Sequence, residues 1–341
     1  MTINFKDFEK LDTVAAIKSA PQANFLLTDL NLFQNSNSLN PVAQVNDLVE
    51  KAVDELKQVS RYGTDTNSIS MSKPVLRSQE IPTVHTSADV KPADWQGLVS
   101  AQNPDIGASI TEVIAQKAIR MRDAKLEYVE KALAKALFEQ KADASKTDDG
   151  DLDFNSIMGV TPLDFELDAA IGSSIYQQFG RMKRQLVAQY GAARSYVDRF
   201  YMFCSPELYD AIAGHVEVTS LITSKVAEAA RGALIADNTS GYDSFTIGST
   251  TFVLADDDRY TIAANSGLIV PKFGAASADV NAFKTITGPC SRNQTIATKG
   301  AVSDLYQWIN TDKNGMIEIN QEFSMIPLVL RPNYMMNVTI A

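Results

Sequence analysis

A long helical pattern between residues 104 and 142 constrains this chain more than any other feature. Pro104 is tolerated in a first helical turn, and Asn103 before it can act as an N-cap. Beyond it, apolar residues recur at steps of three or four, which is the period of one helix face. These residues are Ile110, Ile114, Ala118, Met121, Ala124, Tyr128, Ala132 and Ala136, with Val113, Leu126, Val129, Leu133 and Leu137 on a second flank. A helix far longer than the roughly 11–12 residues of a globular average indicates a scaffold.

The other face of this predicted helix carries polar and charged residues and is expected to be exposed. Glu127 and Lys131 have the favourable spacing of an acid four residues before a base. The polar positions are Glu112, Gln116, Asp123, Glu127, Glu130, Lys131, Lys135 and Glu139. The helix therefore has one face for a core and one for solvent.

Composition places the chain among soluble globular proteins. At 341 residues it can bury a large core and is expected to form two or more lobes. A formal net charge of −10 gives no general attraction to phosphate, which argues against a broad nucleic-acid groove. Cys204 and Cys290 alone make no disulfide framework and indicate a reducing compartment. Without a signal-peptide pattern or a membrane-spanning run, the protein is expected to be soluble and intracellular when made.

Residues 1–59 are predicted to form an arm. Short helical pieces lie around residues 14–17 and 26–30, a polar loop covers 31–40, and an amphipathic helix follows Asn40-Pro41 over 42–56. The arm has phenylalanines with no local core, and they must dock either on this subunit or on a neighbour. They are Phe5, Phe8, Phe25 and Phe33.

Ser, Thr, Asn, Asp, Pro and Gly dominate residues 60–103, and large apolar side chains are few. The short extended pieces 73–77 and 81–84 each contain a proline, which suits edge strands. So long a polar stretch is unusual inside a compact domain, and it favours a projecting two-stranded hairpin stabilised by contacts outside its own subunit. Its charged residues are candidates for ion pairs between subunits: Lys73, Arg77, Glu80 and Lys91.

The rest of the chain alternates strands and helices. Two helical segments are predicted within 164–190, and an apolar strand over 200–204 precedes a helix that Ser205-Pro206 begins. Further predicted elements in this mixed α/β lobe, about 160–304, are a hairpin around Gly248 and a strand over 267–271. The last stretch predicts a hairpin turning at Asn314-Gly315. Strands over 325–330 and 335–340 follow it, and all of these strands are expected to pack against the long helix.

Few residues suit catalysis. Cys204, His215 and Asp256 are the candidates for a hydrolase or a metal-dependent enzyme, and no nucleotide-binding or nucleophile-elbow motif accompanies them. Cys204 closes an apolar strand, so a buried structural thiol is favoured. The acidic run Asp151-x-Asp153-x-Asn155 starts like a calcium loop, but Pro162 stands where the bidentate glutamate belongs. A solvated turn is therefore favoured.

Two arginines on the long helix, Arg120 and Arg122, could contact phosphate. The neighbouring Asp123 and the acidic total favour a solvated or subunit-interface role instead.

Residues 203–218 resemble a segment of the lambda-type, or E-family, major capsid proteins of tailed phages. Further similar segments follow in the order of that family. They are Phe245-Thr246-Ile247-Gly248 with Phe252-Val253, residues 267–279 with Pro271, Phe273 and Ala278-Asp279, Asn314-Gly315, and Pro327-Leu328 to Arg331-Pro332. Residues 120–135 resemble the spine helix of the family. The resemblance covers about residues 70–341, and Ala275-Ala276-Ser277 depart from the usual pattern.

The resemblance implies an α+β chain with the HK97-like capsid fold. It places an N-terminal arm at 1–59, an extended E-loop hairpin at 60–103, a peripheral domain with the spine helix at 104–160 and 305–341, and an axial domain at 161–304. The residue patterns alone indicate the same parts: a long helix on a sheet, a hairpin without a local core, and an arm.

We therefore expect a major capsid protein of a tailed double-stranded DNA phage, without catalysis or cofactor. The resemblance implies self-assembly through hexamers and pentamers into an icosahedral head, in the host cytoplasm, that encloses DNA without sequence-specific binding. Portal, scaffold and decoration proteins are further candidate partners, and no membrane is involved. Another phage structural protein, such as a tail-tube or ring component, and an α/β hydrolase stay open as alternatives.

Overall fold

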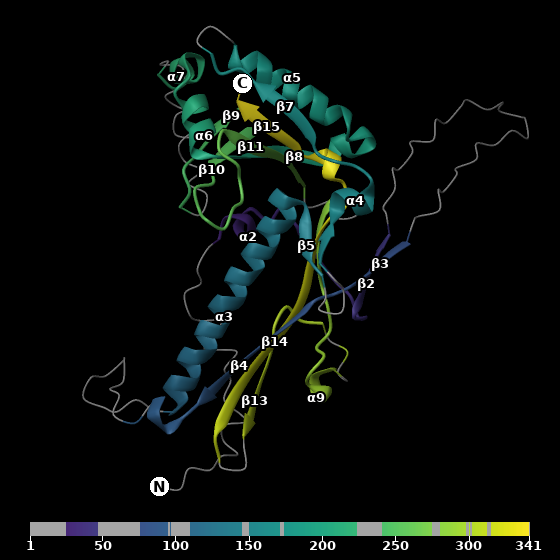
Figure 1. Cartoon of the computed structure of the whole chain (residues 1–341), viewed down its shortest axis with the longest axis vertical. Helices are drawn as coiled ribbons and strands as arrows, with labels where there is room; N and C mark the ends of the chain where they lie inside the picture. The colour runs from purple at the N-terminus through teal and green to yellow at the C-terminus, as the bar shows by residue number, and fades with distance from the viewer. Residues whose placement is uncertain are drawn as a thin grey trace, which may run out of the picture.

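Two β-sheets and one long helix set the architecture of the computed structural model (Figure 1). The structure describes residues 25–46, 76–94, 96, 110–144, 150–170, 174–223, 241–274, 280–297, 300, 302–311 and 315–340. Within these residues, a five-stranded sheet lies beside the long helix, and a six-stranded sheet covered by helices forms the opposite end of the molecule (Figure 1). The mixed α and β content confirms the predicted fold class.

The five-stranded sheet is built around one long strand, β14. Its strands are β1 (Gln34–Asn37), β4 (Thr83–Val90), β12 (Phe283–Thr287), β13 (Tyr306–Thr311) and β14 (Ile317–Val329). β14 pairs antiparallel with β13 along its first half and with β12 along its second half, while β4 pairs with the first half from the other side. β1 adds to β12 in parallel. The β13–β14 pair confirms the predicted hairpin, and Asn314 of its predicted turn lies outside the described residues.

The six-stranded sheet has the order β7-β15-β11-β8-β10-β9. Its strands are β7 (Leu163–Leu167), β8 (Val197–Cys204), β9 (Ser244–Ile247), β10 (Thr250–Leu254), β11 (Ser266–Phe273) and β15 (Met336–Ile340). The predicted strand at 200–204, the hairpin around Gly248 and the strand at 267–271 are confirmed. Gly248 has φ +64°, a conformation that L side chains rarely adopt.

The remaining elements are helices and two short ladders. The helices are α2 (Leu26–Leu30), α3 (Ile110–Ala134), α4 (Phe154–Met158), α5 (Ile175–Ala188), α6 (Pro206–Ala213), α7 (Val216–Thr223) and α9 (Gln294–Ala297). The ladders pair β2 (Val42–Asn46) with β3 (Leu76–Glu80) and β5 (Lys141–Asp143) with β6 (Asp151–Asp153). As predicted, α6 begins at Ser205-Pro206, and the Ser205 hydroxyl accepts a hydrogen bond from the Leu208 N–H.

The long helix α3 is shorter than the sequence predicts. It continues as a π-helical turn, Lys135–Glu139, and then ends because Gln140 is left-handed, with φ 51°. The Gln140 side chain donates to the Leu137 and Phe138 carbonyls, both at 3.2 Å, and so satisfies groups that a helix end leaves open. Residues 141 and 142, predicted as helix, belong to strand β5 (Lys141–Asp143) instead, and 104–109 lie outside the described residues.

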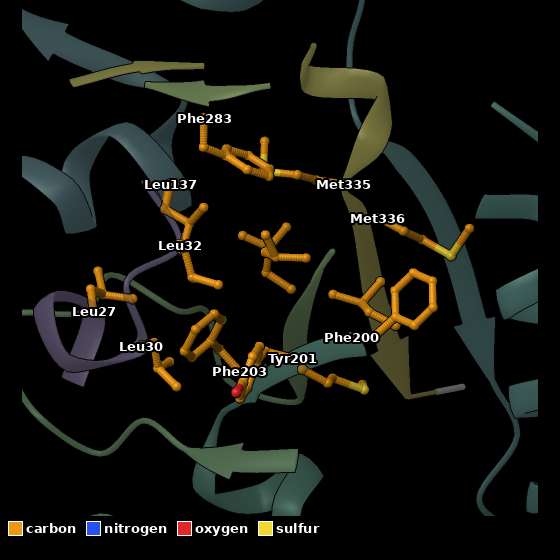
Figure 2. Packing of buried hydrophobic residues seen from close by; sticks show 14 of the residues in the cluster. Leu27, Leu30, Leu32, Leu137, Phe200, Tyr201, Phe203, Phe283, Met335 and Met336 are labelled. Atoms are coloured by element: carbon orange, nitrogen blue, oxygen red, sulfur yellow. The ribbon is translucent and has the colours of Figure 1, made fainter. Parts of the chain in front are cut away.

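The main hydrophobic core lies where the end of α3 meets both sheets (Figure 2). Fully buried side chains from distant segments gather there, including Leu27, Leu137, Phe203, Phe283 and Met336. The Phe138 ring stands edge-on to Phe203, with centroids 5.5 Å apart. A smaller cluster joins the first half of α3 to the five-stranded sheet. Continuous burial across the junction ties the two ends of the molecule together.

Three sequence-based assignments are wrong. The helix predicted over 42–56 is strand β2 in its described part, 42–46, and 47–56 lie outside the described residues. The first helix predicted within 164–190 is strand β7, because alternate side chains face the core while the strand pairs with β15. The polar loop predicted over 31–40 contains β1. Tertiary pairing overrides local pattern in each case.

Strand pairing also differs from the expectation in two places. The predicted hairpin of 73–77 with 81–84 does not form, because β3 pairs with β2 and β4 pairs with β14. The predicted strand at 325–330 is the second half of β14. β15 lies in the six-stranded sheet rather than under α3, and β12 lies in the five-stranded one. The chain therefore crosses between the two sheets several times.

Candidate functional site: the assembly elements

The ladder of β2 and β3 lies to one side of both sheets (Figure 1). Its base is fixed to the body, because the Ile81 N–H donates to the Pro41 carbonyl at 2.9 Å and Ala43 and Ile81 are buried. At its other end Asn46 pairs with Leu76. Residues 47–75, which connect these two strands, lie outside the described residues. β2, one of the two paired strands, therefore lies upstream of the predicted hairpin range 60–103, and β3 lies within it.

The charged candidates of the predicted hairpin lie on different elements. Lys73 is outside the described residues, and Arg77 pairs with Val45 in the β2–β3 ladder. Glu80, at the end of β3, and Lys91, just after β4, are exposed. Pairing of these residues with another copy stays a prediction.

Both phenylalanines of the arm that the structure describes dock on their own subunit. Phe33 is 4% exposed and stands edge-on to Phe283, with centroids 5.7 Å apart. Phe25 is half-buried beneath the Arg259 guanidinium, 4.9 Å from the ring centroid. This is one of the two outcomes that the sequence left open. Phe5 and Phe8 lie outside the described residues.

The two arginines of α3 have different environments. Arg120 is exposed and stays a candidate for a subunit interface. Arg122 is 4% exposed, and its guanidinium donates to the Asp123 carboxylate from Nε at 3.1 Å and from Nη2 at 2.8 Å. Its burial within the subunit leaves little of Arg122 for a neighbour.

Glu130 of α3 holds the arm onto the body, although the sequence places it on the exposed face. It is fully buried, and its carboxylate accepts hydrogen bonds from the Leu27 N–H at 2.7 Å and the Thr28 N–H at 3.0 Å. The hydroxyls of Thr28 and Tyr260 donate to it at 2.8 Å each. Because Phe25 gives α2 no side-chain cap, Glu130 caps this helix from across the molecule.

The Glu130 cluster joins three segments that are far apart in the sequence: the arm end, the C-terminal part of α3 and the 256–262 loop. Burial, together with the nearby Glu130 carboxylate, raises the pKa of Tyr260 and keeps its hydroxyl a donor. A single glutamate on a helix gives no sequence signal for partners about a hundred positions away. Reasoning from the sequence therefore missed this site.

A second buried carboxylate, Glu322, organises the loop before α9. It is fully buried on β14 and accepts from the Ser291 N–H at 2.5 Å, the Ser291 hydroxyl at 2.8 Å and the Arg292 N–H at 3.1 Å. The Cys290 thiol lies 3.5 Å from the same carboxylate. These bonds fix residues 290–292 against the five-stranded sheet.

The enzyme alternative gains no support from the positions of its candidates. Cys204 is fully buried in β8, and burial raises the pKa of its thiol. His215 is buried beside α7, where its Nδ1 accepts from the Glu217 N–H at 3.3 Å. Asp256 is exposed in the loop after β10. We find no hydrogen bond or ring contact between any two of them.

Two carboxylates of the acidic run at 151–155 have partners within the subunit. Asp151 pairs with Lys135 at 2.8 Å, and Asp153 caps α4 by accepting from the Asn155 N–H at 3.0 Å. Within the part of the chain that the structure describes, no cluster of three or more potential metal ligands occurs. Among the described helices, none is both long and apolar enough to cross a bilayer.

Asp257 gives a pH-dependent prediction. Arg259 donates to its carboxylate, at 2.9 Å from Nε to each oxygen, and Tyr242 donates at 3.1 Å. The Arg259 bonds lower the pKa of Asp257 to about 2. A lowered pKa contributes stability above the ordinary value of 3.8, and this contribution disappears as the pH falls toward 2. Asp257→Asn should therefore lower the melting temperature at pH 7, and the difference from the unaltered protein should shrink between pH 4 and pH 2. A difference that stays constant over this range would contradict the assignment.

The comparisons with known proteins agree with one another. The chain matches the model of a family described as phage major capsid protein E over residues 13–340. Among solved structures it is similar to a protein assigned as the capsid protein of a prophage from Escherichia coli CFT073, at 11% identity and a TM-score of 0.57, over 100% of both chains. It also matches the capsid of cyanophage P-SCSP1u, at 12% identity and a TM-score of 0.48, over 95% of this chain and 90% of that one. A search of curated proteins finds no match.

The likeness to the E. coli prophage protein confirms the capsid fold that the resemblance implies. The family match spans nearly the whole chain, including the described end of the arm, the long helix and both sheets. The chain therefore belongs to the phage major capsid protein E family, the structural proteins that form the shell of the virion.

Proposed function

We propose that identical copies of this chain assemble through hexamers and pentamers into an icosahedral head around double-stranded DNA, in the host cytoplasm and without catalysis. The family match over residues 13–340 carries the proposal. The β2–β3 ladder supports it, because its base is anchored in the core while its far end leads into residues 47–75. Such a hairpin suits contact with a neighbouring copy, and large permanent interfaces bury thousands of Å².

The formal net charge of −10 is consistent with a wall that encloses DNA without holding it tightly. Portal, scaffold and decoration proteins are proposed as further partners. The exposed Glu80, Lys91 and Arg120 remain candidates for pairing between copies. No observation favours a tail-tube component or a hydrolase.

A deletion tests the proposal. Residues 47–75 are replaced by Asn-Gly, which joins Asn46 to Leu76 through the turn that antiparallel hairpins prefer. The unaltered chain should sediment as megadalton particles, and the deletion variant should stay soluble, keep its thermal unfolding transition and form no shells. The deletion stops at residue 75 because one that reached β4 would remove a strand paired along β14.

A variant with a Gly/Ser stretch of equal length in place of 47–75 is the matched control. It keeps the chain length and removes only the side chains, so it should also fail to form shells. Closed particles from the deletion variant would contradict the role of the hairpin. Unaltered protein that stays monomeric at high concentration would contradict the proposed function itself.

A further inference from the structure

β13 has an outer edge whose backbone groups face away from the sheet. Consecutive residues of a strand direct their N–H and C=O groups to opposite edges. On β14, the Ser324 carbonyl accepts from Gly288 on the side of β12, and the Met325 N–H donates to Pro82 on the side of β4. β13 and β4 pair with the same residues of β14, so they lie on its two opposite edges, and β12 lies on the edge of β13. The even-numbered residues of β14 therefore direct their backbone N–H and C=O groups toward β12 and β13.

The register of the β13–β14 ladder then fixes which groups of β13 point outward. Trp308 opposes Asn320 and Asn310 opposes Glu318, so the even-numbered residues of β13 direct their N–H and C=O groups toward β14. The backbone groups of Gln307, Ile309 and Thr311 point to the outer edge. Among the described residues, no strand pairs with this edge and no backbone hydrogen bond reaches it.

Other strands in the molecule show how an edge is closed. On β4, the Lys117 ammonium donates to the outward Asp89 carbonyl at 2.5 Å. At the end of β7, the Gln178 amide both accepts from the Asp168 N–H at 2.9 Å and donates to its carbonyl at 2.8 Å. Natural edge strands use such contacts, charges, prolines or bulges against pairing with another chain. β13, with the sequence Tyr-Gln-Trp-Ile-Asn-Thr, has no charge and no proline, and its ladder with β14 has no bulge.

We propose that β13 pairs antiparallel with β13 of a second copy across a two-fold axis, joining two five-stranded sheets into one. The outward groups require odd-numbered residues to oppose odd-numbered residues, and one such register uses all three outward residues of both copies: Ile309 opposes Ile309, and Gln307 opposes Thr311 of the second copy. An uncharged strand meets its own copy without repulsion between like charges. This inference rests on the proposed function, because it requires identical copies side by side in a wall.

The symmetry of this pairing fits a closed shell. A two-fold axis that relates two antiparallel strands of one sheet stands perpendicular to that sheet. The same face of both copies therefore points to the same side of the joined sheet. α3 packs on one face of the five-stranded sheet, where Gln321 donates to the Met121 carbonyl at 3.0 Å (Figure 1). Both copies therefore keep α3 on the same side of the joined sheet. A wall with an inner and an outer surface requires this.

Cysteine crosslinking tests the register. Opposed residues that exchange hydrogen bonds have Cα atoms about 5.5 Å apart, within reach of a disulfide. Ile309→Cys should therefore form covalent dimers when assembled particles are oxidised and run on a denaturing gel without reductant. Gln307→Cys and Thr311→Cys should each give no dimer alone, because each lies about 13 Å from its own copy. Co-assembled, the two single variants should give dimers.

The native Cys204 and Cys290 are both buried. Oxidised particles of the unaltered chain measure any crosslinking through these two cysteines. Particles that assemble but yield neither crosslink overturn the pairing and leave the proposed function intact. If the unaltered chain forms no particles, the proposed function fails instead. In that case, absence of crosslinks in concentrated soluble protein overturns the pairing as well.

Discussion

Glu130→Ala is expected to lower the free energy of unfolding by about 3–5 kcal/mol, because Glu130 accepts several buried hydrogen bonds and each bond to a charged group contributes about 1.5–3 kcal/mol. The substitution leaves the Leu27 and Thr28 N–H groups and the Thr28 and Tyr260 hydroxyls without their acceptor. Each unsatisfied buried donor costs about 1–3 kcal/mol, and part of this returns when the arm detaches and water reaches α2. Local release of the arm end should therefore precede global unfolding.

Urea denaturation of dissociated subunits measures the loss, and limited proteolysis reports whether the arm end opens first. Glu127→Gln is the matched control, since Glu127 lies on the same helix and pairs with Lys131 at 2.7 Å on an exposed surface. Such pairs contribute at most about 1 kcal/mol. If the two variants unfold alike, Glu130 does not anchor the arm.

Phe203→Ala should be destabilising by about 3–5 kcal/mol, the usual range for removing a buried aromatic side chain. Phe203 is fully buried in β8 (Figure 2). Its ring meets the Phe138 ring edge-on. The cavity would open where the π-helical end of α3 packs on the six-stranded sheet, and the surrounding strands restrict its collapse.

Thermal unfolding of dissociated subunits should show Phe203→Leu much closer to the unaltered protein, because it conserves most of the volume and costs less than about 1.5 kcal/mol. The same ranking should appear in particle yield if stability of the subunit limits assembly. An alanine variant as stable as the leucine variant would mean that the junction repacks.

Features with strong local signals could be predicted from the sequence. The apolar run ending at Cys204, the Ser205-Pro206 helix start and the Asn314-Gly315 hairpin each combine burial with a specific turn or cap. The long helix was predictable from its period, although its end was not. Gln140 adopts a left-handed conformation, which is uncommon for glutamine and is not indicated by the sequence.

Features that depend on distant partners could not be predicted. Residues 42–46 have a helical apolar pattern but form a strand, because Leu76–Glu80 supplies the pairing. Glu130 has the charge of a surface residue but lies at the centre of a cluster whose donors come from the arm end and the 256–262 loop. In each case the missing information is a contact across tens of residues or more, which local pattern does not contain.

The repeated passage of the chain between the two sheets has a mechanical consequence. β12 is inserted in one sheet, β14 follows in the same sheet, and β15 then enters the other beside β11 and β7. Tension that pulled the two ends of a subunit apart would load several hydrogen-bonded strands at once instead of a single flexible tether. In a container filled under internal pressure, several strand pairs of each subunit would carry the stress together. Each subunit should therefore extend little before its strands separate.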